Sequence, residues 1–249
     1  MIRGLYTAVA GLLANLQRQE AVIHNLANLQ TIGYKADRTT LTDFPSLLLA
    51  QISGARVGPV VGKAGTGVAL DGLETNFADG PLQLTEHPFD FATLGNAFFR
   101  VETPDGVRYT RDGRFHRDAD GQLVNANGYR VLGDNGPITL PNGLVTVSLH
   151  GEIFVDGNPA GRISLARFND TSSLVKQDQT LFYSQGIEPE LIPPNEAQVY
   201  QGYLERSNVD TGQAVTEMLT TLRAYQANQR LVQFQDQMNA QAASQLGRI

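Results

Sequence analysis

The sequence predicts an α+β protein in which N- and C-terminal helices pair as a coiled coil and a mostly antiparallel β domain is inserted between them. Three features predict this: heptad spacing at both ends, a C-terminal helix with few charges, and regularly spaced turn dipeptides in the middle. The expected domains are residues 1–50 plus 205–249 for the helices, 51–93 plus 183–204 for an extended β-rich connector, and 94–182 for the β domain.

The first helix is expected from about Ile2 to Asn28 or Gln30, with a stop by Gly33, because glycine tolerates the positive φ of a helix end. Apolar residues recur at alternating steps of four and three, which is typical of a coiled-coil seam with Gln19 as its polar member. The apolar members of this series are Leu5, Val9, Leu12, Leu16, Ile23 and Leu26.

The last helix is expected to begin after Asn208 or Asp210, which can cap its first turn, and to end near Leu246. Its stripe slips in phase once, which indicates a stutter. The stripe consists of Val215, Met218, Leu222, Tyr225, Leu231, Phe234 and Met238. Between Gln213 and Leu246 only four residues are charged, and most others are small or polar. We therefore expect contacts on more than one side; the alternative is a solvated helix pair that closes a monomer.

The middle of the chain carries turn dipeptides seven or eight residues apart, and each can supply the positive φ angles of a tight hairpin. They are Asp105-Gly106, Asp112-Gly113, Asp120-Gly121, Asn127-Gly128, Asn135-Gly136 and Asn142-Gly143. The segments between them are rich in β-branched and aromatic residues, which suit strands. This pattern predicts a compact antiparallel domain from about Leu94 to Phe182.

Composition excludes several classes of protein. The net charge is −6 and the basic residues are scattered, so nucleic acid is not an expected partner. The chain has no cysteine, which rules out disulfides. No apolar run reaches the roughly 18 residues of a membrane span. The segment after Arg3 is similar to a signal peptide, but the heptad continues past it, so we expect it to remain in the mature protein.

No catalytic, cofactor or metal site is expected, and the protein is not expected to be an enzyme. Gly58–Ala64 falls one residue short of a phosphate-binding loop and lacks its Ser or Thr, so a flexible loop is predicted there. His116–Asn127 has some calcium-loop positions but His at the first and Asn at the last, which favours a hairpin turn.

Contiguous motifs stand near both ends of the chain: Asn25–Lys35 near the N-terminus, and Gly202–Asp210 and Arg223-Ala224-Tyr225 toward the C-terminus. These motifs resemble the signatures of bacterial flagellar basal-body rod and hook proteins. The signature residues are Asn25, Leu26, Ala27, Asn28, Gly33, Tyr34, Lys35, Ser207, Asn208, Val209, Arg223, Ala224 and Tyr225. Matches at 65–68, 98–101, 109–113 and 121–124 follow in the same order.

Chain length and the Asp43–Leu49 stretch look most like the proximal-rod F type and its hook-basal-body relatives, with the distal rod protein second. His24, Gln30, Ala97 and Gln226 depart from the residues usual in the family, which affects the subtype.

The resemblance implies a structural subunit that self-assembles into a helical, tubular drive shaft carrying torque from motor to hook. Its partners would be further copies, neighbouring rod or hook subunits and the flagellar type III export apparatus. Its place would be outside the cytoplasmic membrane, in the periplasm or cell wall, without a cleaved signal peptide. The expected self-assembly seam is Leu5, Val9, Leu12, Leu16, Ile23, Leu26, Met218, Leu222, Tyr225, Leu231, Phe234 and Met238. The alternative is a monomeric module that binds cell-wall glycan through the β domain.

Overall fold

The computed structural model of the chain describes residues 2–43, 47–53, 56–65 and 67–246. The chain forms two compact units: a helical unit from residues 1–26, 37–74 and 211–249, and a β unit from residues 27–36 and 75–210. The α+β class with a β domain inserted between terminal helices is confirmed. The three-part domain division stays a prediction, and residues 44–46 of the Asp43–Leu49 stretch lie outside the described residues.

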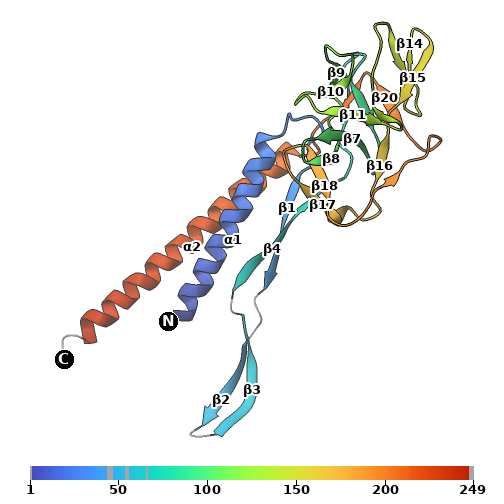
Figure 1. Ribbon diagram of the computed structural model, residues 1–249. Coiled ribbons are helices and arrows are strands. Elements are labelled where there is room, and N and C mark those ends of the chain that lie inside the picture. The colour runs from blue at the N-terminus through green and yellow to red at the C-terminus, as the bar shows by residue number, and fades with distance from the viewer. Residues whose placement is uncertain (1, 44–46, 54–55, 66, 247–249) are drawn as a thin grey trace. The chain divides into compact units, whose positions relative to one another are not determined.

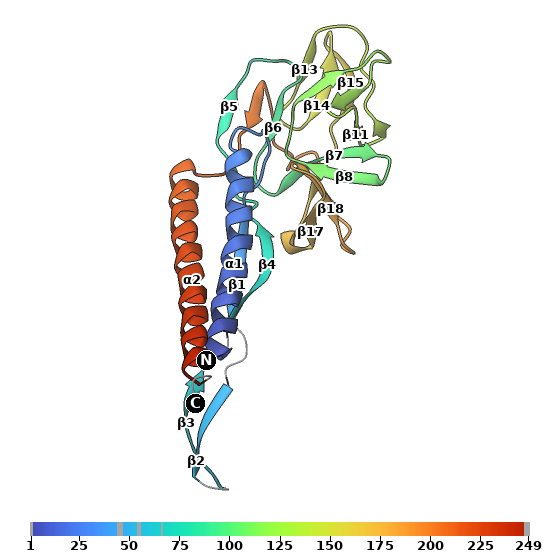
Figure 2. The ribbon, with the colours of Figure 1, turned by 90° about the vertical axis from the view of Figure 1, so that its left-hand side faces the viewer.

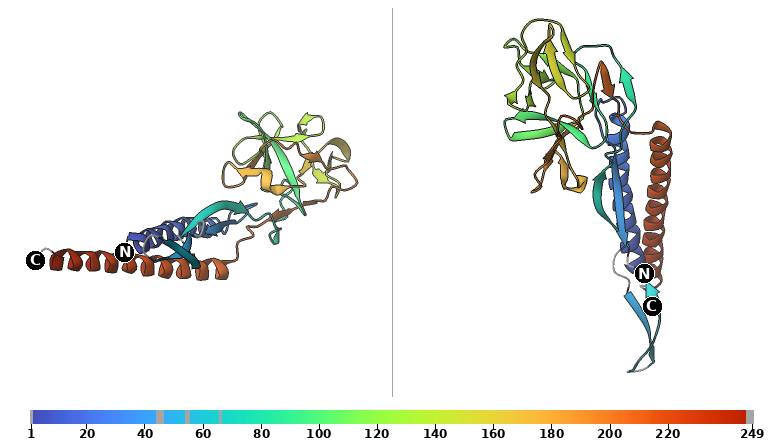
Figure 3. Two further views of the ribbon diagram at one scale, coloured as in Figure 1. Left: turned by 90° about the horizontal axis from the view of Figure 1, so that it is seen from below. Right: turned by 90° about the vertical axis from the view of Figure 1, so that its right-hand side faces the viewer.

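The helical unit is built on α1 (Ile2–Ala27) and α2 (Thr211–Leu246), which lie side by side and antiparallel (Figures 1 and 2). Figure 3 shows the same pair from two further sides. The predicted bounds of α2 are confirmed, whereas α1 ends at Ala27, before the expected Asn28. Within the described part of the chain, no helix combines the length and the hydropathy that crossing a membrane requires.

Two antiparallel ribbons complete the helical unit. β1 (Asp37–Asp43) pairs with β4 (Val68–Thr75), and β2 (Leu47–Ser53) pairs with β3 (Arg56–Ala64). The prediction of a flexible loop at Gly58–Ala64 is wrong, because this segment lies within β3. Its valines favour an extended strand, and the pairing with β2 satisfies backbone groups that a loop would leave to water.

The β unit contains one large antiparallel sheet with the strand order β17-β18-β8-β7-β11-β10-β9, in which β12 also pairs with β11, and β16 with β7 and β19. The strands of this sheet are β7 (Ala97–Thr103), β8 (Gly106–Thr110), β9 (Phe115–Arg117), β10 (Leu123–Asn125), β11 (Arg130–Gly133), β12 (Gly136–Pro137), β16 (Leu165–Arg167), β17 (Leu174–Lys176), β18 (Leu181–Ser184) and β19 (Glu190–Leu191). A short 3-10 helix, η1 (Thr171–Ser173), precedes β17.

Smaller sheets flank this one. A three-stranded sheet has the order β13-β14-β15, and two strand pairs, β20-β6 and β21-β5, join distant parts of the sequence. Their bounds are β5 (Leu82–Leu84), β6 (Phe91–Thr93), β13 (Val145–Val147), β14 (Glu152–Val155), β15 (Asn158–Arg162), β20 (Val199–Gln201) and β21 (Tyr203–Glu205).

Four of the six turn dipeptides connect antiparallel neighbours as predicted. Gly106, Gly121, Gly128 and Gly136 all have positive φ and lie between or at the ends of paired strands. The other two predictions are wrong. Gly113 packs against the main chain of Phe91, where an added Cβ would lie 1.7 Å from the carbonyl oxygen, and Asn142-Gly143 forms a bend before β13. Close packing, which sequence does not reveal, requires the glycine at position 113.

Strand β7 is buried on both faces and separates two apolar clusters. Because successive strand residues point to opposite faces, Phe99 and Val101 enter one cluster with Leu123 and Ile153, whereas Phe98 enters the other. Around Phe98 the rings of Phe77, Phe168 and Phe182 pack at centroid distances of 5.6, 5.7 and 6.1 Å with steep interplanar angles. The β unit therefore has a core of its own.

Replacing Phe98 by alanine is expected to lower the free energy of unfolding of the β unit by about 3–5 kcal/mol, because a fully buried ring is removed from a packed cluster. Urea unfolding followed by tyrosine near-UV circular dichroism measures this change. Leu144→Ala, at a side chain that is 71% exposed, is the matched control and should change it by less than about 0.5 kcal/mol. Equal effects of the two substitutions would contradict the assignment of Phe98 to the core.

Candidate functional site

A buried carboxylate, that of Glu205, organises the β unit. It follows Leu204 in β21, and its Oε1 lies 2.6 Å from the Nζ of Lys35 and accepts the backbone N–H of Gly80 at 2.7 Å. Both Glu205 and Lys35 are almost completely buried. Lys35 also donates to the carbonyl oxygens of Phe77, at 3.3 Å, and Ala78, at 2.8 Å. All three ammonium hydrogens thus have acceptors within reach.

Arg111 supplies a second cation to the same carboxylate. Its Nη1 lies 3.2 Å from Glu205 Oε2 and 3.3 Å from Asp79 Oδ1, and its Nη2 donates to the carbonyl of Gly95. The guanidinium carbon lies 4.6 Å from the centroid of the Phe98 ring, a cation–π contact. Lys35, Arg111, Glu205 and Asp79, which we call the junction cluster, carry two positive and two negative charges.

The charge balance of the junction cluster explains how Lys35, Arg111 and Glu205 can be buried, with Asp79 at the exposed edge. Burial lowers the pKa of the Lys35 amino group below its ordinary value, repulsion from Arg111 lowers it further, and the charge and hydrogen bond of Glu205 oppose both. A buried charge that loses its partner is strongly destabilising, so each member holds the others in place.

The junction cluster joins three segments at which the chain passes between the two units: residues 33–36, 76–80 and 205–208. Asn208 reinforces it, since its Oδ1 accepts the N–H of Ala36 at 2.8 Å and its Nδ2 donates to the carbonyls of Asn76 and Ala78. The Asn76 N–H in turn donates to the Ala36 carbonyl at 2.8 Å. The chain crossings are thereby fixed to one another inside the β unit.

Gly33 is the tightest point of this arrangement. Its N–H donates to the carbonyl of Glu205 at 2.8 Å, its φ is 69°, and an added Cβ would lie 2.3 Å from the backbone nitrogen of Asp112. A glycine is therefore required both by the backbone conformation and by space. Gly33 lies beyond the end of α1 and shapes the turn after it.

Two other signature residues, Asn25 and Tyr34, make side-chain contacts near these crossings. The Asn25 side chain both accepts from the N–H of Asp37 at 2.9 Å and donates to its carbonyl at 2.7 Å, which pairs the end of α1 with the start of β1. Tyr34 is buried under the ammonium of Lys176, 4.3 Å from its ring centroid, and Lys176 donates to the Lys35 carbonyl.

The remaining signature residues divide between the two units. Asn28 and Ser207 are buried, and Leu26, Val209 and Tyr225 are half-buried. Ala27, Arg223 and Ala224 are exposed. Sequence analysis did not single out Glu205, Arg111 or Asp79, because nothing local links residues that lie tens of positions apart in the chain.

Contact between α1 and α2 runs along small and polar residues. A Cβ at Gly11 would lie 3.0 Å from Asn228 Nδ2, one at Gly4 would lie 3.5 Å from Gln235 Nε2, and Arg18 Nη2 lies 2.7 Å from Glu217 Oε1. Among the described side chains of the two helices, the buried ones are Ala8, Ala14, Ala21, Val22, Ala214 and Thr221. We call this the inner row; four of its members, Ala8, Val22, Ala214 and Thr221, come one residue before apolar residues of the predicted stripes.

The predicted seam residues lie beside the inner row or away from it. On α1, Leu5, Leu12 and Leu26 are half-buried, whereas Val9, Leu16 and Ile23 are exposed. On α2, Met218, Leu222, Tyr225 and Met238 are half-buried, and Leu231 and Phe234 are exposed, with Phe234 at 56%. Their role in self-assembly stays a prediction.

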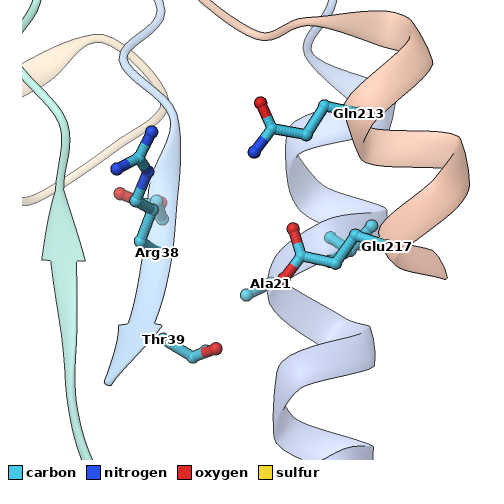
Figure 4. A pocket seen from close by; sticks show the side chains of 7 residues that line it. Ala21, Arg38, Thr39, Gln213 and Glu217 are labelled. Atoms are coloured by element: carbon cyan, nitrogen blue, oxygen red, sulfur yellow. The ribbon is translucent and has the colours of Figure 1, made fainter. Parts of the chain in front are cut away.

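A polar hollow of about 250 Å³ opens between the two helices and β1. Figure 4 shows Arg38 and Thr39 on β1, with Gln213 and Glu217 projecting from α2 and Ala21 on α1. No group of His, Cys, Asp and Glu side chains in the described residues has the geometry of a metal site. The hollow thus offers hydrogen-bonding groups but no recognisable catalytic set.

Comparison with known proteins identifies the family. Residues 92–155 match the domain family described as the flagellar hook protein FlgE/F/G D1 domain, and residues 200–246 match the flagellar basal body rod FlgEFG protein C-terminal family. The chain is 33% identical to the flagellar hook-basal body complex protein FlhO of Bacillus subtilis, with 100% of both chains covered. It belongs to the flagellar basal-body rod and hook protein family.

Other members of the family are similarly close. The flagellar basal-body rod protein FlgF of Caulobacter vibrioides is 32% identical with 100% of both chains covered, and FlgG of Bacillus subtilis is 29% identical over 96% of this chain and 97% of that protein. The family resemblance predicted from the sequence is confirmed. No observation on the described residues favours the glycan-binding alternative.

Substitution Glu205→Gln is expected to destabilise the β unit by about 3–5 kcal/mol, because it leaves Lys35 buried without a counter-charge. Urea unfolding gives the change in free energy. Lys35→Met combined with Glu205→Gln should cost less than the sum of the two single variants, with a coupling of about 0.5–3 kcal/mol.

The matched control is Glu102→Gln, whose carboxylate lies 3.9 Å from Arg130 at the surface with both side chains about half exposed. It should cost less than about 1 kcal/mol. If Glu205→Gln costs no more than Glu102→Gln, the junction cluster does not hold the β unit together.

Proposed function

We propose that the chain is a structural subunit of the flagellar basal-body rod, which polymerises into a helical tube through the outer faces of α1 and α2. The observation that carries the proposal is the arrangement of apolar side chains on this helix pair. The inner row consists of four alanines, one valine and one threonine, and the large exposed apolar residues lie outside it. A helix pair that served only to close a monomer would place those residues between the helices.

The outer face of α1 has the spacing of a second seam. Tyr6, Val9, Leu13, Leu16 and Ile23 follow one another at steps of three, four, three and seven residues, and all are exposed, Tyr6 to 69%. Such a row packs knobs into holes against a further helix. We call it the outer row of α1. In a single chain this row exposes apolar surface to water, which is unfavourable, and a neighbouring subunit would cover it.

The surface of α2 favours close helix contacts as well. Val215, Leu219, Leu231 and Phe234 are exposed, and long charged side chains are rare around them. The apolar faces of α1 and α2 are different surfaces. If the α1 face of one copy contacts the α2 face of the next copy, the contact is heterologous. Heterologous contacts that do not close into a ring produce a filament.

The family also supports the location and the partners of the rod subunit. Relatives that cover the whole chain are named as rod and hook-basal-body components, and we propose the same for this chain. Further copies and neighbouring rod or hook subunits would be its partners, with delivery by the flagellar type III export apparatus to a place outside the cytoplasmic membrane. The role is mechanical and transmits torque to the hook, so no catalysis is proposed.

Removal of an apolar side chain of the predicted seam should prevent polymerisation while the β unit stays folded. Leu16→Ala and Leu222→Ala are expected to lower polymer yield and motility, because truncating an apolar side chain that acts as a hot spot of an interface costs about 2 kcal/mol or more. Sedimentation over a concentration series and swimming of a complemented strain measure the two effects.

Gln17→Ala, at the exposed neighbour of Leu16 on α1, is the control and should leave both readouts unchanged. Unchanged polymer yield and motility in Leu16→Ala and Leu222→Ala would refute the proposed interface. Near-UV circular dichroism of each variant shows that the β unit has kept its fold.

The helical unit of a monomer should exchange its amide hydrogens rapidly, because the inner row buries little apolar surface and leaves the helix pair dependent on neighbours. We expect about the first 30 and last 40 residues to be weakly protected before assembly and strongly protected in the polymer. Hydrogen exchange read by mass spectrometry tests this. Strong protection of Leu12 and Leu222 in a verified monomer would overturn the expectation.

A further inference from the structure

The β unit contains three Asn-Gly dipeptides, which differ in the hydrogen bonding of their glycine N–H groups and in the contacts of their Asn side chains. We propose that Asn142 is a site of spontaneous deamidation, in which the backbone nitrogen of Gly143 attacks the Asn142 side chain with assistance from Arg117 and Asp156. This modification needs water alone and no enzyme or cofactor. It is independent of the proposed function.

The Gly143 nitrogen forms a bond to Cγ of Asn142 and loses its proton, and the oxygen of the side-chain amide carries the developing negative charge. The carbonyl then re-forms as the Cγ–Nδ2 bond breaks, and Nδ2 takes up a proton equivalent to the one that Gly143 lost, so that ammonia leaves. The product is a five-membered succinimide. Water adds to either of its carbonyls, which yields aspartate or isoaspartate at position 142.

The availability of the attacking nitrogen distinguishes the three dipeptides. Gly128 N–H donates to the Asn125 carbonyl at 2.9 Å, and Gly136 lies in β12, paired with Gly133 of β11. Gly143 lies in a bend outside any strand, and within the described chain its N–H makes no hydrogen bond. Attack at Gly128 or Gly136 must first disrupt a hairpin, whereas attack at Gly143 does not.

Arg117 stabilises the charge that the reaction develops. Its Nη1 donates to the Pro141 carbonyl at 3.0 Å, and its Nη2 donates to Oδ1 of Asn142. A cationic donor on this oxygen polarises the Cγ–Oδ1 bond and stabilises the tetrahedral oxyanion, as an oxyanion hole does. Of the Asn residues in the three dipeptides, only Asn142 has such a contact in the described structure.

Asp156 places a carboxylate beside the attacking residue. Its Oδ1 accepts the N–H of Leu144 at 2.9 Å, and its Oδ2 faces Gly143 so closely that a Cβ there would lie 2.3 Å away. A side chain at position 143 would therefore displace the carboxylate. We assign Asp156 as the group that takes the Gly143 proton, directly or through one water molecule.

The test is peptide mapping of the full-length folded protein after incubation in ¹⁸O-labelled water at neutral pH, with digestion at acidic pH. The label identifies deamidation that occurred during the incubation. Asn142 is expected to convert at least about tenfold faster than Asn127 and Asn135, as a barrier difference of about 1.4 kcal/mol gives. In urea the three rates should converge, since the hairpins that protect Asn127 and Asn135 are lost.

Two variants test whether Arg117 assists deamidation of Asn142 or whether the exposure of Asn142 alone explains its rate. Arg117→Gln should slow Asn142 deamidation by about three- to tenfold, while Arg130→Gln, which removes a surface arginine paired with Glu102, should leave it unchanged. A rate at Asn142 equal to or below that at Asn127 in the folded protein would overturn the site. Unchanged or faster deamidation in a folded Arg117→Gln variant would overturn the role of the guanidinium.

Discussion

The β unit depends on the burial of one carboxylate. Glu205 accepts from Lys35, Arg111 and the Gly80 amide through its side chain, and from Gly33 through its carbonyl. A carboxylate taken out of water is tolerated only when its partners surround it. The segments that supply these partners must therefore meet in one arrangement, and all except the one that carries Arg111 adjoin points where the chain passes to or from the helical unit.

The helical unit follows a different principle. Its inner row consists of alanines, one valine and one threonine, and Gly4 and Gly11 face polar side chains of α2, so the helix pair gains little from apolar burial. The larger apolar residues are on the outer faces, where one chain cannot cover them. This distribution fits a subunit whose exposed apolar helix faces are covered by neighbouring subunits. It also explains why the spacing of large apolar residues did not predict the inner row.

The two units thus suit different tasks in the proposed rod. The β unit has a core on both faces of β7, and Phe98 connects one of these cores to the guanidinium of Arg111. Both cores are made of residues of the β unit alone. In the proposed rod the helical unit would supply the surfaces for polymerisation, and the junction cluster holds together segments of the β unit that lead to and from the helices.

The sequence by itself determined the two terminal helices, most of the hairpin turns and the family. These follow from local signals: heptad spacing, capping residues, turn dipeptides and contiguous motifs such as Asn25–Lys35. Local periodicity also showed that apolar residues of α1 lie along one side.

Only the tertiary structure decided which side of α1 meets α2, that Gly58–Ala64 is a strand, and that Gly113 is a close contact and no hairpin turn. It also brought Lys35, Arg111 and Glu205 together across 170 residues of chain. The physical reason is the same throughout: helix approach, strand pairing and charge neutralisation are interactions between distant segments, and no property of either segment alone specifies its partner.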